Sequence, residues 1–342
     1  MPAPVRVDMF LLAGQFPGSS HAQALHDALS YALAAERAGF DGVWIAEHHF
    51  ISYGTCPSAL AFAAHLLGRT TRIRVGTAAC ILSNRHPVAL AEEATLLDEL
   101  SGGRLDLGVA RGGPWIDLDV FGTGLSRYTH GFPESLDLLL AWLSGTNNVG
   151  AHGEFFRFPP VRVVPQPRRQ VPVWVAATSE PTVEAAATRG LPLLLGMHAA
   201  ADEKRRLLDQ YDKQPTADLP NAGAIPHASA HLAYVADTLK QAHDVLRAAM
   251  PSWLSTTAQY VRIDATTGGS TGPARDPHAY LEHLLGIHPV GPAELCVRRL
   301  AATVATTGVR RLLLMVEGAG DPDRTLANIA RLGTEVLPHL RG

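Results

Sequence analysis

A glutamate and two neighbouring histidines, Glu47, His48 and His49, stand in the stretch IAEHHFISYG directly after a short aliphatic run. Histidine titrates near neutral pH and can donate or accept a proton, which suits acid–base work in a pocket. Adjacent residues of a strand point to opposite faces, so the two histidines are not expected to share a metal ion. The sequence also has no HExxH motif. The pattern therefore predicts a polar role in a pocket and no metal site, with a structural histidine as the alternative.

Two further stretches could hold an anion. In VARGG, Arg111 is followed by Gly112 and a second glycine, so the backbone can approach a ligand while a guanidinium binds it. In AATSEPT, the hydroxyls of Thr178, Ser179 and Thr182 and the amides of a starting helix supply donors for a phosphate. A solvated arginine and an ordinary N-cap are the alternatives. If both stretches end neighbouring strands, a phosphate fits between them.

Short aliphatic runs that could position these residues recur along the whole chain. Many are continuous rather than alternating, which is typical of parallel strands that are buried on both faces. The eight candidate strands are Val5–Leu12, Gly42–Ala46, Arg72–Ala79, Arg104–Ala110, Pro172–Ala177, Leu191–Gly196, Ser229–Val235 and Arg310–Val316.

Helical patterns alternate with these strands. Ser20–Arg37 places leucines at i, i+4 spacing before Gly39, and the other clear cases are Pro87–Leu100 and Pro181–Arg189. Repeated strand–helix alternation predicts an α/β fold, a (β/α)₈ TIM barrel. A doubly wound sheet is the alternative, but no candidate strand is followed by GxGxxG.

Two stretches are longer than the alternation of strands and helices requires. Residues 112–170 form an excursion after the fourth strand, and residues 264–289, rich in Gly, Pro, Thr and His, predict a long loop before the eighth strand. We expect one barrel domain over residues 1–342.

Composition excludes several classes of protein. The chain has 29 Lys and Arg against 32 Asp and Glu, and this near balance gives no reason to expect a nucleic-acid partner. No run of about 20 apolar residues predicts a membrane span. Three scattered cysteines, Cys56, Cys80 and Cys296, fit a reducing compartment, so we expect a cytoplasmic protein.

Taken in order, the segments resemble one known family. FDGVWIAEHHF, RIRVGTAACIL, HPVALAEEATLLDELSGGRLDLGVARGG, VFGTGLSR, VPVWVAATSEPTVEAAATRGLP and HPVGPAELC are similar to the bacterial luciferase-like flavin monooxygenases, in particular to the luciferase alpha-subunit branch. The resemblance covers residues 5–235 and returns more weakly at 288–340. Each motif is modest, but their order and spacing are specific. The family fold is a (β/α)₈ barrel with an excursion after strand four.

The resemblance implies roles for single residues. His48 matches the catalytic histidine beside the reacting edge of the flavin, and Asp117 matches an acid in a loop near the site. Ala78 and Ala79 match a pair that is joined by a non-proline cis peptide under the flavin ring. The matching phosphate-binding positions are Arg111, Gly112, Thr178, Ser179 and Thr182.

The sequence departs from luciferases at three places. Ala110 stands where many luciferases have a reactive cysteine, and Met197, followed by His198, stands where they place a tryptophan of the flavin pocket. The region that matches the lid, 264–289, is shorter and richer in Gly and Pro. These differences leave light emission and a long-chain aldehyde substrate open, but they do not affect the general chemistry of flavin and oxygen.

The resemblance implies a monooxygenase that uses reduced FMN and O₂ through a flavin C4a-hydroperoxide to oxygenate a small-molecule substrate. His48 would hydrogen-bond the oxygenated flavin or act as its acid–base partner. Because the sequence shows no nicotinamide-binding fingerprint, we expect a separate flavin reductase. Luciferases pair their barrels through helices near strands two and three, so the resemblance implies a homodimer contact at the apolar helix predicted over Ser58–Leu67, with ordinary barrel packing as the alternative.

Two other readings stay open. The same barrel could use the deazaflavin F420 for hydride transfer, as a related branch does. The chain could also be a non-catalytic partner subunit, like the luciferase beta chain, although the intact Arg111–Gly112 pair argues against this.

Overall fold

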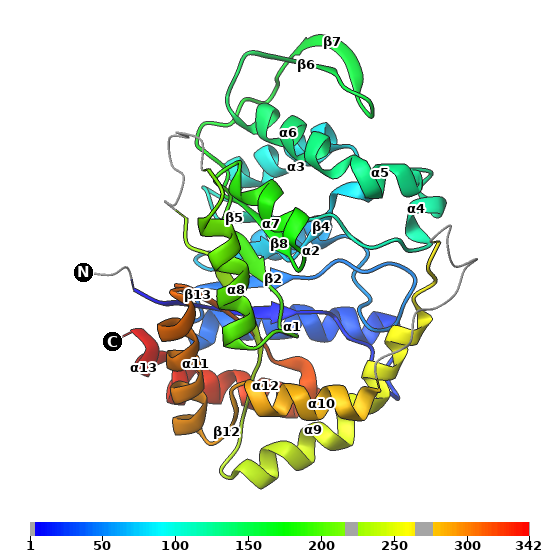
Figure 1. The fold of residues 1–342 in the computed structure, drawn as a ribbon. Coiled ribbons are helices and arrows are strands. Elements are labelled where there is room, and N and C mark those ends of the chain that lie inside the picture. The colour runs from blue at the N-terminus through cyan, green and yellow to red at the C-terminus, as the bar shows by residue number, and fades with distance from the viewer. Residues whose placement is uncertain (1–3, 216–224, 264–275, 342) are drawn as a thin grey trace.

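The computed structural model describes residues 4–215, 225–263 and 276–341, and its centre is a closed parallel β-barrel surrounded by helices (Figure 1). Neighbouring strands pair in the order β3-β2-β1-β13-β10-β9-β8-β5-β4, and an additional β3–β5 pairing closes the ring. The predicted (β/α)₈ barrel is confirmed. All strands of this sheet are parallel, so their carboxyl ends share one mouth.

Each of the eight candidate strands overlaps a strand of the barrel. Their bounds are β1 Arg6–Leu11, β2 Gly42–Ile45, β3 Arg74–Thr77, β5 Leu105–Ala110, β8 Val173–Ala177, β9 Leu193–Leu195, β10 Ala228–Leu232 and β13 Arg311–Met315. The segment after β3 continues as β4, Cys80–Ile81, so that β3 and β4 run in succession along β5. The candidate Ser229–Val235 is split, because its last two residues form β11, Tyr234–Val235, which pairs with β12, Val290–Gly291.

The predicted helices are also present. They are α1 His21–Ala38, α2 Ala59–Leu67, α3 Pro87–Leu100 and α7 Glu180–Ala187. Ser20 caps α1 by accepting from Gln23 N at 3.1 Å, and Gly39 ends it in the left-handed region. The fully buried face of α1 consists of four alanines and Tyr31 rather than the leucines, which flank it half-buried, because small side chains let the helix approach the barrel closely.

The predicted excursion after the fourth strand contains three helices and a hairpin. These are α4 Asp117–Val120, α5 Gly124–His130, α6 Phe132–Leu143, and the antiparallel pair β6 Asn148–His152 and β7 Arg157–Arg162. The hairpin projects from the barrel at the top of Figure 1. The remaining helices are α8 Ala201–Asp212, α9 Leu239–Leu254, α10 Pro277–Ile287, α11 Ala293–Thr307, α12 Pro322–Arg331 and α13 Leu337–Arg341.

The expectation of a long loop over 264–289 is wrong for its second half, where residues 277–287 form α10. Asp276 caps this helix with Pro277 at its first position, and Leu281, Leu284 and Leu285 bury one face at helical spacing. Residues 264–275 lie outside the described part of the chain.

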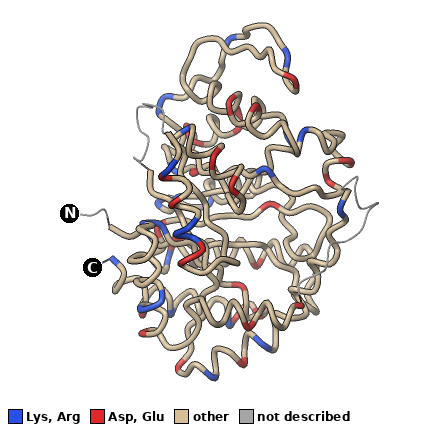
Figure 2. The backbone as a smooth tube through the Cα atoms, in the orientation of Figure 1, with Lys and Arg blue, Asp and Glu red and all other residues tan. Residues whose placement is uncertain are grey.

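Three free cysteines are all buried. Across the described ranges, no helix combines the length and apolarity that a bilayer crossing requires. Lys and Arg positions are interspersed with Asp and Glu positions along the tube (Figure 2), as expected from the balanced composition.

Charged residues fill the end of the barrel where the strands begin. Arg311, only 2% exposed, lies between the carboxylates of Asp8 and Asp106, and its Nη2 is 2.6 Å from Asp106 Oδ2. Arg74 donates to the same Asp106 through Nε at 3.0 Å. Burial alone would raise the pKa of Asp106, but the two guanidiniums hold it below its usual value. This network joins β1, β3, β5 and β13 inside the barrel.

Two tryptophans cover this network on the side of the barrel mouth. The guanidinium of Arg311 lies 4.8 Å from the ring of Trp44 and 5.1 Å from the ring of Trp174. Trp44 also donates from Nε1 to Asp8 Oδ2 at 2.7 Å. The indole of Trp44 fits because Gly76 faces it: a Cβ at residue 76 would come within 2.3 Å of the ring.

We predict that Arg311→Met lowers the free energy of unfolding by about 3–5 kcal/mol, because it leaves buried carboxylates without their shared cation. Urea unfolding followed by far-UV circular dichroism measures this. The control is Arg247→Met, which removes a half-exposed pair with Glu282 and should cost much less, because water screens an exposed ion pair. Equal losses in the two variants would contradict a special role for the buried network.

Candidate active site

Two adjoining cavities lie at the barrel mouth. One, of about 360 Å³, is lined by the EHHFI turn and by residues of the first excursion. The other, of about 230 Å³, lies over the barrel interior, and the described residues that line it include no Asp, Glu, Lys or Arg. His48, Ala78 and Ala176 line both cavities, so the cavities meet at these residues.

Alternation along the strands explains why there is space here. Side chains that point into the barrel recur every second residue, so Trp44 is followed inward by Ala46, and Trp174 by Ala176. Large side chains therefore fill the middle of the barrel, while methyl groups face its mouth. The alanines that line the two cavities are Ala46, Ala78, Ala79, Ala110, Ala176, Ala228 and Ala230.

The peptide bond between Ala78 and Ala79 is cis, which confirms that prediction. It lies between β3 and β4, directly beside the junction of the two cavities. Met197, at the end of β9, lines the smaller cavity together with His198. The carbonyl of Met197 accepts from His288 Nε2 at 2.5 Å, so a buried histidine holds this wall in place.

His48 is half-buried at the end of β2, and its backbone N–H donates to Cys56 O at 2.9 Å. Burial, with a smaller contribution from His49, lowers the pKa of His48 to about 4. At neutral pH the side chain is therefore an uncharged imidazole. The ring packs against Tyr53 at 5.3 Å in an edge-to-face arrangement.

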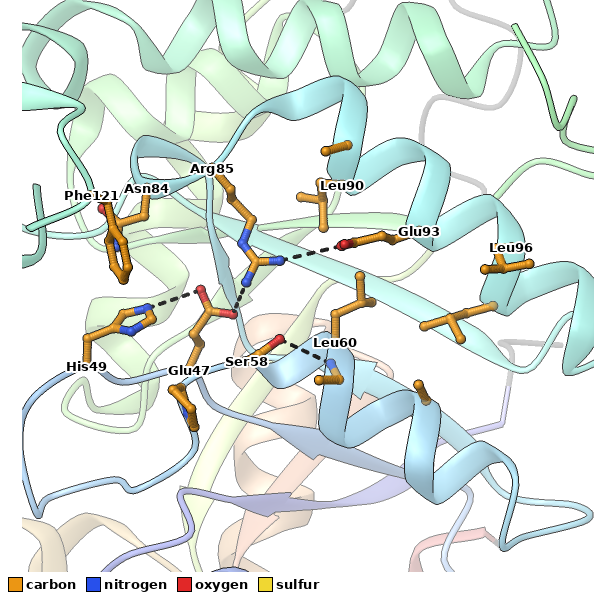
Figure 3. Close-up of a pocket in the computed structure, with 15 residues that line it drawn as sticks. Glu47, His49, Ser58, Leu60, Asn84, Arg85, Leu90, Glu93, Leu96 and Phe121 are labelled. Carbon is orange, nitrogen blue, oxygen red and sulfur yellow. Dashed lines mark hydrogen bonds and ion pairs between the residues drawn. The ribbon is translucent and has the colours of Figure 1, made fainter.

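Glu47 anchors the turn that carries His48 (Figure 3). Its carboxylate accepts from Ala59 N at the start of α2 and from Ile81 N of β4, both at 3.2 Å, and from Arg85 Nη2 at 3.1 Å. His49 Nε2 lies 3.6 Å from the same carboxylate. Glu47 thus ties three elements together at the barrel mouth, while His49 faces the outer cavity drawn in Figure 3.

The candidate phosphate residues lie at the ends of two paired strands. Val109 of β5 is in register with Val175 of β8, which brings the following residues, Arg111 and those from Thr178 onward, to the same edge. Nε of Arg111 is buried without a partner, and its guanidinium lies 4.7 Å from the ring of Tyr128. Gly112 has a φ of +83°, a conformation that favours glycine.

The start of α7 offers fewer donors than the sequence suggested. Ser179 Oγ lies 3.1 Å from Thr182 Oγ1 and makes no capping bond to the backbone, so this hydroxyl pair is available to a ligand. Pro181 has no N–H, and Thr182 N donates to Ser179 O at 3.1 Å. The first-turn amide that remains is that of Glu180. An orphaned guanidinium nitrogen, a hydroxyl pair and a helix start suit a phosphate.

The predicted site residues fall into two groups. His48, Ala78, Ala79, Gly112 and Met197 line the cavities. Arg111, Thr178, Ser179 and Thr182 are outside these linings, at the strand ends beyond them. Asp117 lines the larger cavity and accepts from Asn84 Nδ2 at 2.7 Å.

Several contacts at the site were not foreseen from the sequence. Arg127 and Tyr128 of α5 lie beside the phosphate edge, where Arg127 stacks on Phe156 at 4.6 Å and has a buried Nε without a partner. Arg127 belongs to the VFGTGLSR motif, which is part of the family resemblance, but the sequence analysis gave this arginine no role. Residues 114–116 and 261–263 form an isolated bridge along the larger cavity, with Tyr260 stacked on Trp115 at 4.6 Å. No sequence pattern indicated that bridge.

The comparison with known proteins agrees with this geometry. The profile of the family described as luciferase-like monooxygenase matches residues 5–311. The chain belongs to this family. The prediction of a luciferase-like, flavin-dependent monooxygenase is thereby confirmed at the level of the family.

Individual relatives span nearly the whole chain. The alkanal monooxygenase alpha chain of the Kryptophanaron alfredi symbiont is 29% identical over 97% of this chain and 97% of its own. The oxygenating constituent of 3,6-diketocamphane monooxygenase from Pseudomonas putida, solved with FMN, superposes with a TM-score of 0.76 at 19% identity, over 98% of both chains. An F420-dependent secondary alcohol dehydrogenase gives 0.75 at 17%, over 99% of this chain and all of its own. These two superpositions show the fold that is shared.

We predict that burial of the neutral His48 makes the protein sensitive to acid. The pKa of about 4 in the folded chain lies below the ordinary 6.5, so the unfolded chain takes up a proton that the folded chain does not. The free energy of unfolding of the wild type, relative to His48→Gln, should therefore fall as the pH drops from 6.5 to about 4, by up to about 1.4 kcal/mol per pH unit.

Urea unfolding at a series of pH values measures the free energy of unfolding of both proteins. Titrating groups that the two proteins share contribute equally, so their contributions cancel in the difference. His21→Gln, at an exposed histidine, is the matched control for replacing a histidine by glutamine. A flat difference for His48→Gln would show that the imidazole is not held neutral by burial.

Proposed function

We propose that this chain binds reduced FMN at the barrel mouth and uses O₂ to oxygenate a small organic substrate. The observation that carries the proposal is the meeting of two cavities at His48 and Ala78, next to strand ends that suit a phosphate. When bound, the reduced flavin supplies the activation of oxygen. The chain contributes Arg111, Ser179 and Thr182 to hold the phosphate, and Ala78 and Ala79 to pack against the ring.

The lining of the smaller cavity favours a neutral, largely apolar substrate. Its described walls are aliphatic and aromatic, and the polar side chains among them are His48, Tyr53, His198 and Tyr280. An uncharged His48 fits such a cavity, because it can form a hydrogen bond without introducing a buried charge. The FMN complex of the 3,6-diketocamphane monooxygenase constituent, on the same fold, supports FMN as the flavin.

The function is tested by mixing the protein with reduced FMN and oxygenated buffer in a stopped-flow instrument. A site that shields the flavin should delay the appearance of oxidised flavin absorbance relative to free reduced FMN, and His48→Ala should shorten that delay. Because we propose a separate reductase, the chain with NADH and oxidised FMN should not reduce the flavin. Oxidation at the free-solution rate would contradict the proposal and favour F420, tested by its own binding spectrum, or a non-catalytic partner subunit.

The phosphate site gives a separate prediction. Arg111→Met should weaken FMN binding about 10- to 100-fold, because it removes charge-assisted hydrogen bonds worth about 1.5–3 kcal/mol. Riboflavin, which has no phosphate, should bind the variant and the wild type equally. Fluorescence titration measures both affinities, and Arg157→Met on the exposed hairpin is the control. Equal weakening of FMN and riboflavin would place the phosphate elsewhere.

We also propose a homodimer formed through α2 and α3. These helices border an outer cavity of about 540 Å³ (Figure 3), and α3 carries Leu96 and Leu100 with 50% and 77% of their surface exposed. Such exposed apolar side chains beside a groove are typical of an interface.

Leu96→Glu should convert the dimer to a monomer in light-scattering measurements, because it places a charge in that interface. Val161→Glu, at a similarly exposed apolar residue of β7, should not change the mass. A wild-type chain that is monomeric at micromolar concentration would exclude the homodimer.

A further inference from the structure

The two ring nitrogens of His48 have different surroundings. Nδ1 is buried and has no hydrogen-bond partner. Nε2 is not among the buried, unpartnered atoms, and no bond to it is present in the described part of the chain, although the residue lines both cavities. Nε2 is therefore the nitrogen that a bound molecule can reach.

Gly54 covers Nδ1. A Cβ built on this glycine would lie 2.3 Å from Nδ1 and 2.8 Å from the carbonyl oxygen of Leu12. The glycine hydrogen that occupies this direction therefore points toward the nitrogen, where a larger residue would displace the ring. Among the described residues Nδ1 has no hydrogen-bond partner, and Gly54 packs directly against it.

The turn itself is held firmly. Thr55 N donates to Ala13 O at 2.9 Å, and Trp253 Nε1 donates to Tyr53 O at 3.0 Å. The rings of Tyr53 and Trp253 stack at 4.6 Å, so the turn that flanks His48 is fixed from both sides.

These contacts decide where a neutral imidazole carries its proton. In the Nδ1–H tautomer, a buried N–H would have no acceptor, which costs free energy. In the Nε2–H tautomer, the lone pair on Nδ1 faces a C–H group, which costs less. The proton then belongs on Nε2, which faces the cavity.

We propose that Gly54 and its turn fix His48 as the Nε2–H tautomer, so that His48 donates a hydrogen bond into the cavity and does not act there as a base. The role in the reaction rests on the proposed function, but the tautomer does not. In this arrangement Gly54 is a positioning residue, and it acts through the ring of His48.

The tautomer is tested by nitrogen-15 NMR on the full chain without flavin. His227 is an internal reference, because its Nδ1 accepts from Leu193 N at 2.9 Å and its proton must be on Nε2. The His48 signals are assigned by their loss in His48→Gln. We expect Nδ1 of His48 to resonate as an unprotonated nitrogen, as in His227. A protonated Nδ1 would overturn the proposal.

The donor role is tested by two substitutions. The amide nitrogen of a glutamine can take the place of Nε2, whereas that of an asparagine reaches only as far as Nδ1. In the reduced-FMN experiment, His48→Gln should keep a delay about two- to tenfold longer than His48→Asn, as expected for one retained hydrogen bond. An equal or longer delay for His48→Asn would overturn the donor role.

Gly54→Ala should shift the His48 signals and shorten the delay, and it should add no further loss when His48 is already Gln. Gly286→Ala is the matched control, because a Cβ there meets nothing within 4 Å. An equal effect of Gly54→Ala in both backgrounds would mean that Gly54 does not act through His48. If the wild type itself shows no delay, the proposed function fails, and the NMR result still decides the tautomer.

Discussion

The barrel depends on one buried cation. Arg311 lies between Asp8 and Asp106, with Arg74 completing the network, so four strands that are far apart in sequence share a single charge arrangement. Each of these charged groups would be costly to bury alone, so they must occupy their positions together. The indoles of Trp44 and Trp174 then cover the guanidinium and separate it from the barrel mouth. These two indoles therefore separate the charged end of the barrel from the neutral cavity at the other end.

At the barrel mouth, the residues on both sides of His48 are held in place by contacts with other elements. Glu47 ties the end of β2 to α2, β4 and Arg85, while the stacked rings of Tyr53 and Trp253 fix the following turn. The imidazole is thus held between two rigid anchors, and its burial keeps it uncharged at neutral pH. A neutral donor beside an apolar cavity suits chemistry in which water must be excluded.

The strands could be predicted because they depend on local pattern, whereas Ala78, Ala79 and Met197 were assigned to the flavin pocket only through the family resemblance. Aliphatic runs indicated the strands, and parallel strands bring their ends to one mouth, which is why His48 and Ala78 meet. Contacts between distant residues could not be predicted. No spacing indicates that Arg311 pairs with Asp8, or that Gly54 covers Nδ1 of His48. Helix α10 was missed because its Gly- and Pro-rich flank obscured the helical spacing of its leucines.

The ring of alanines at the mouth has a consequence for how this enzyme could diversify. Ala46, Ala176 and Ala230 line the smaller cavity from separate strands, and the first two follow the buried Trp44 and Trp174 by two residues. Adding one or two carbons at any of them would change the shape of the cavity without disturbing the charges or the indoles below. Stability and substrate preference thus reside in different layers of one barrel, and mutation can explore the second while the first stays constant.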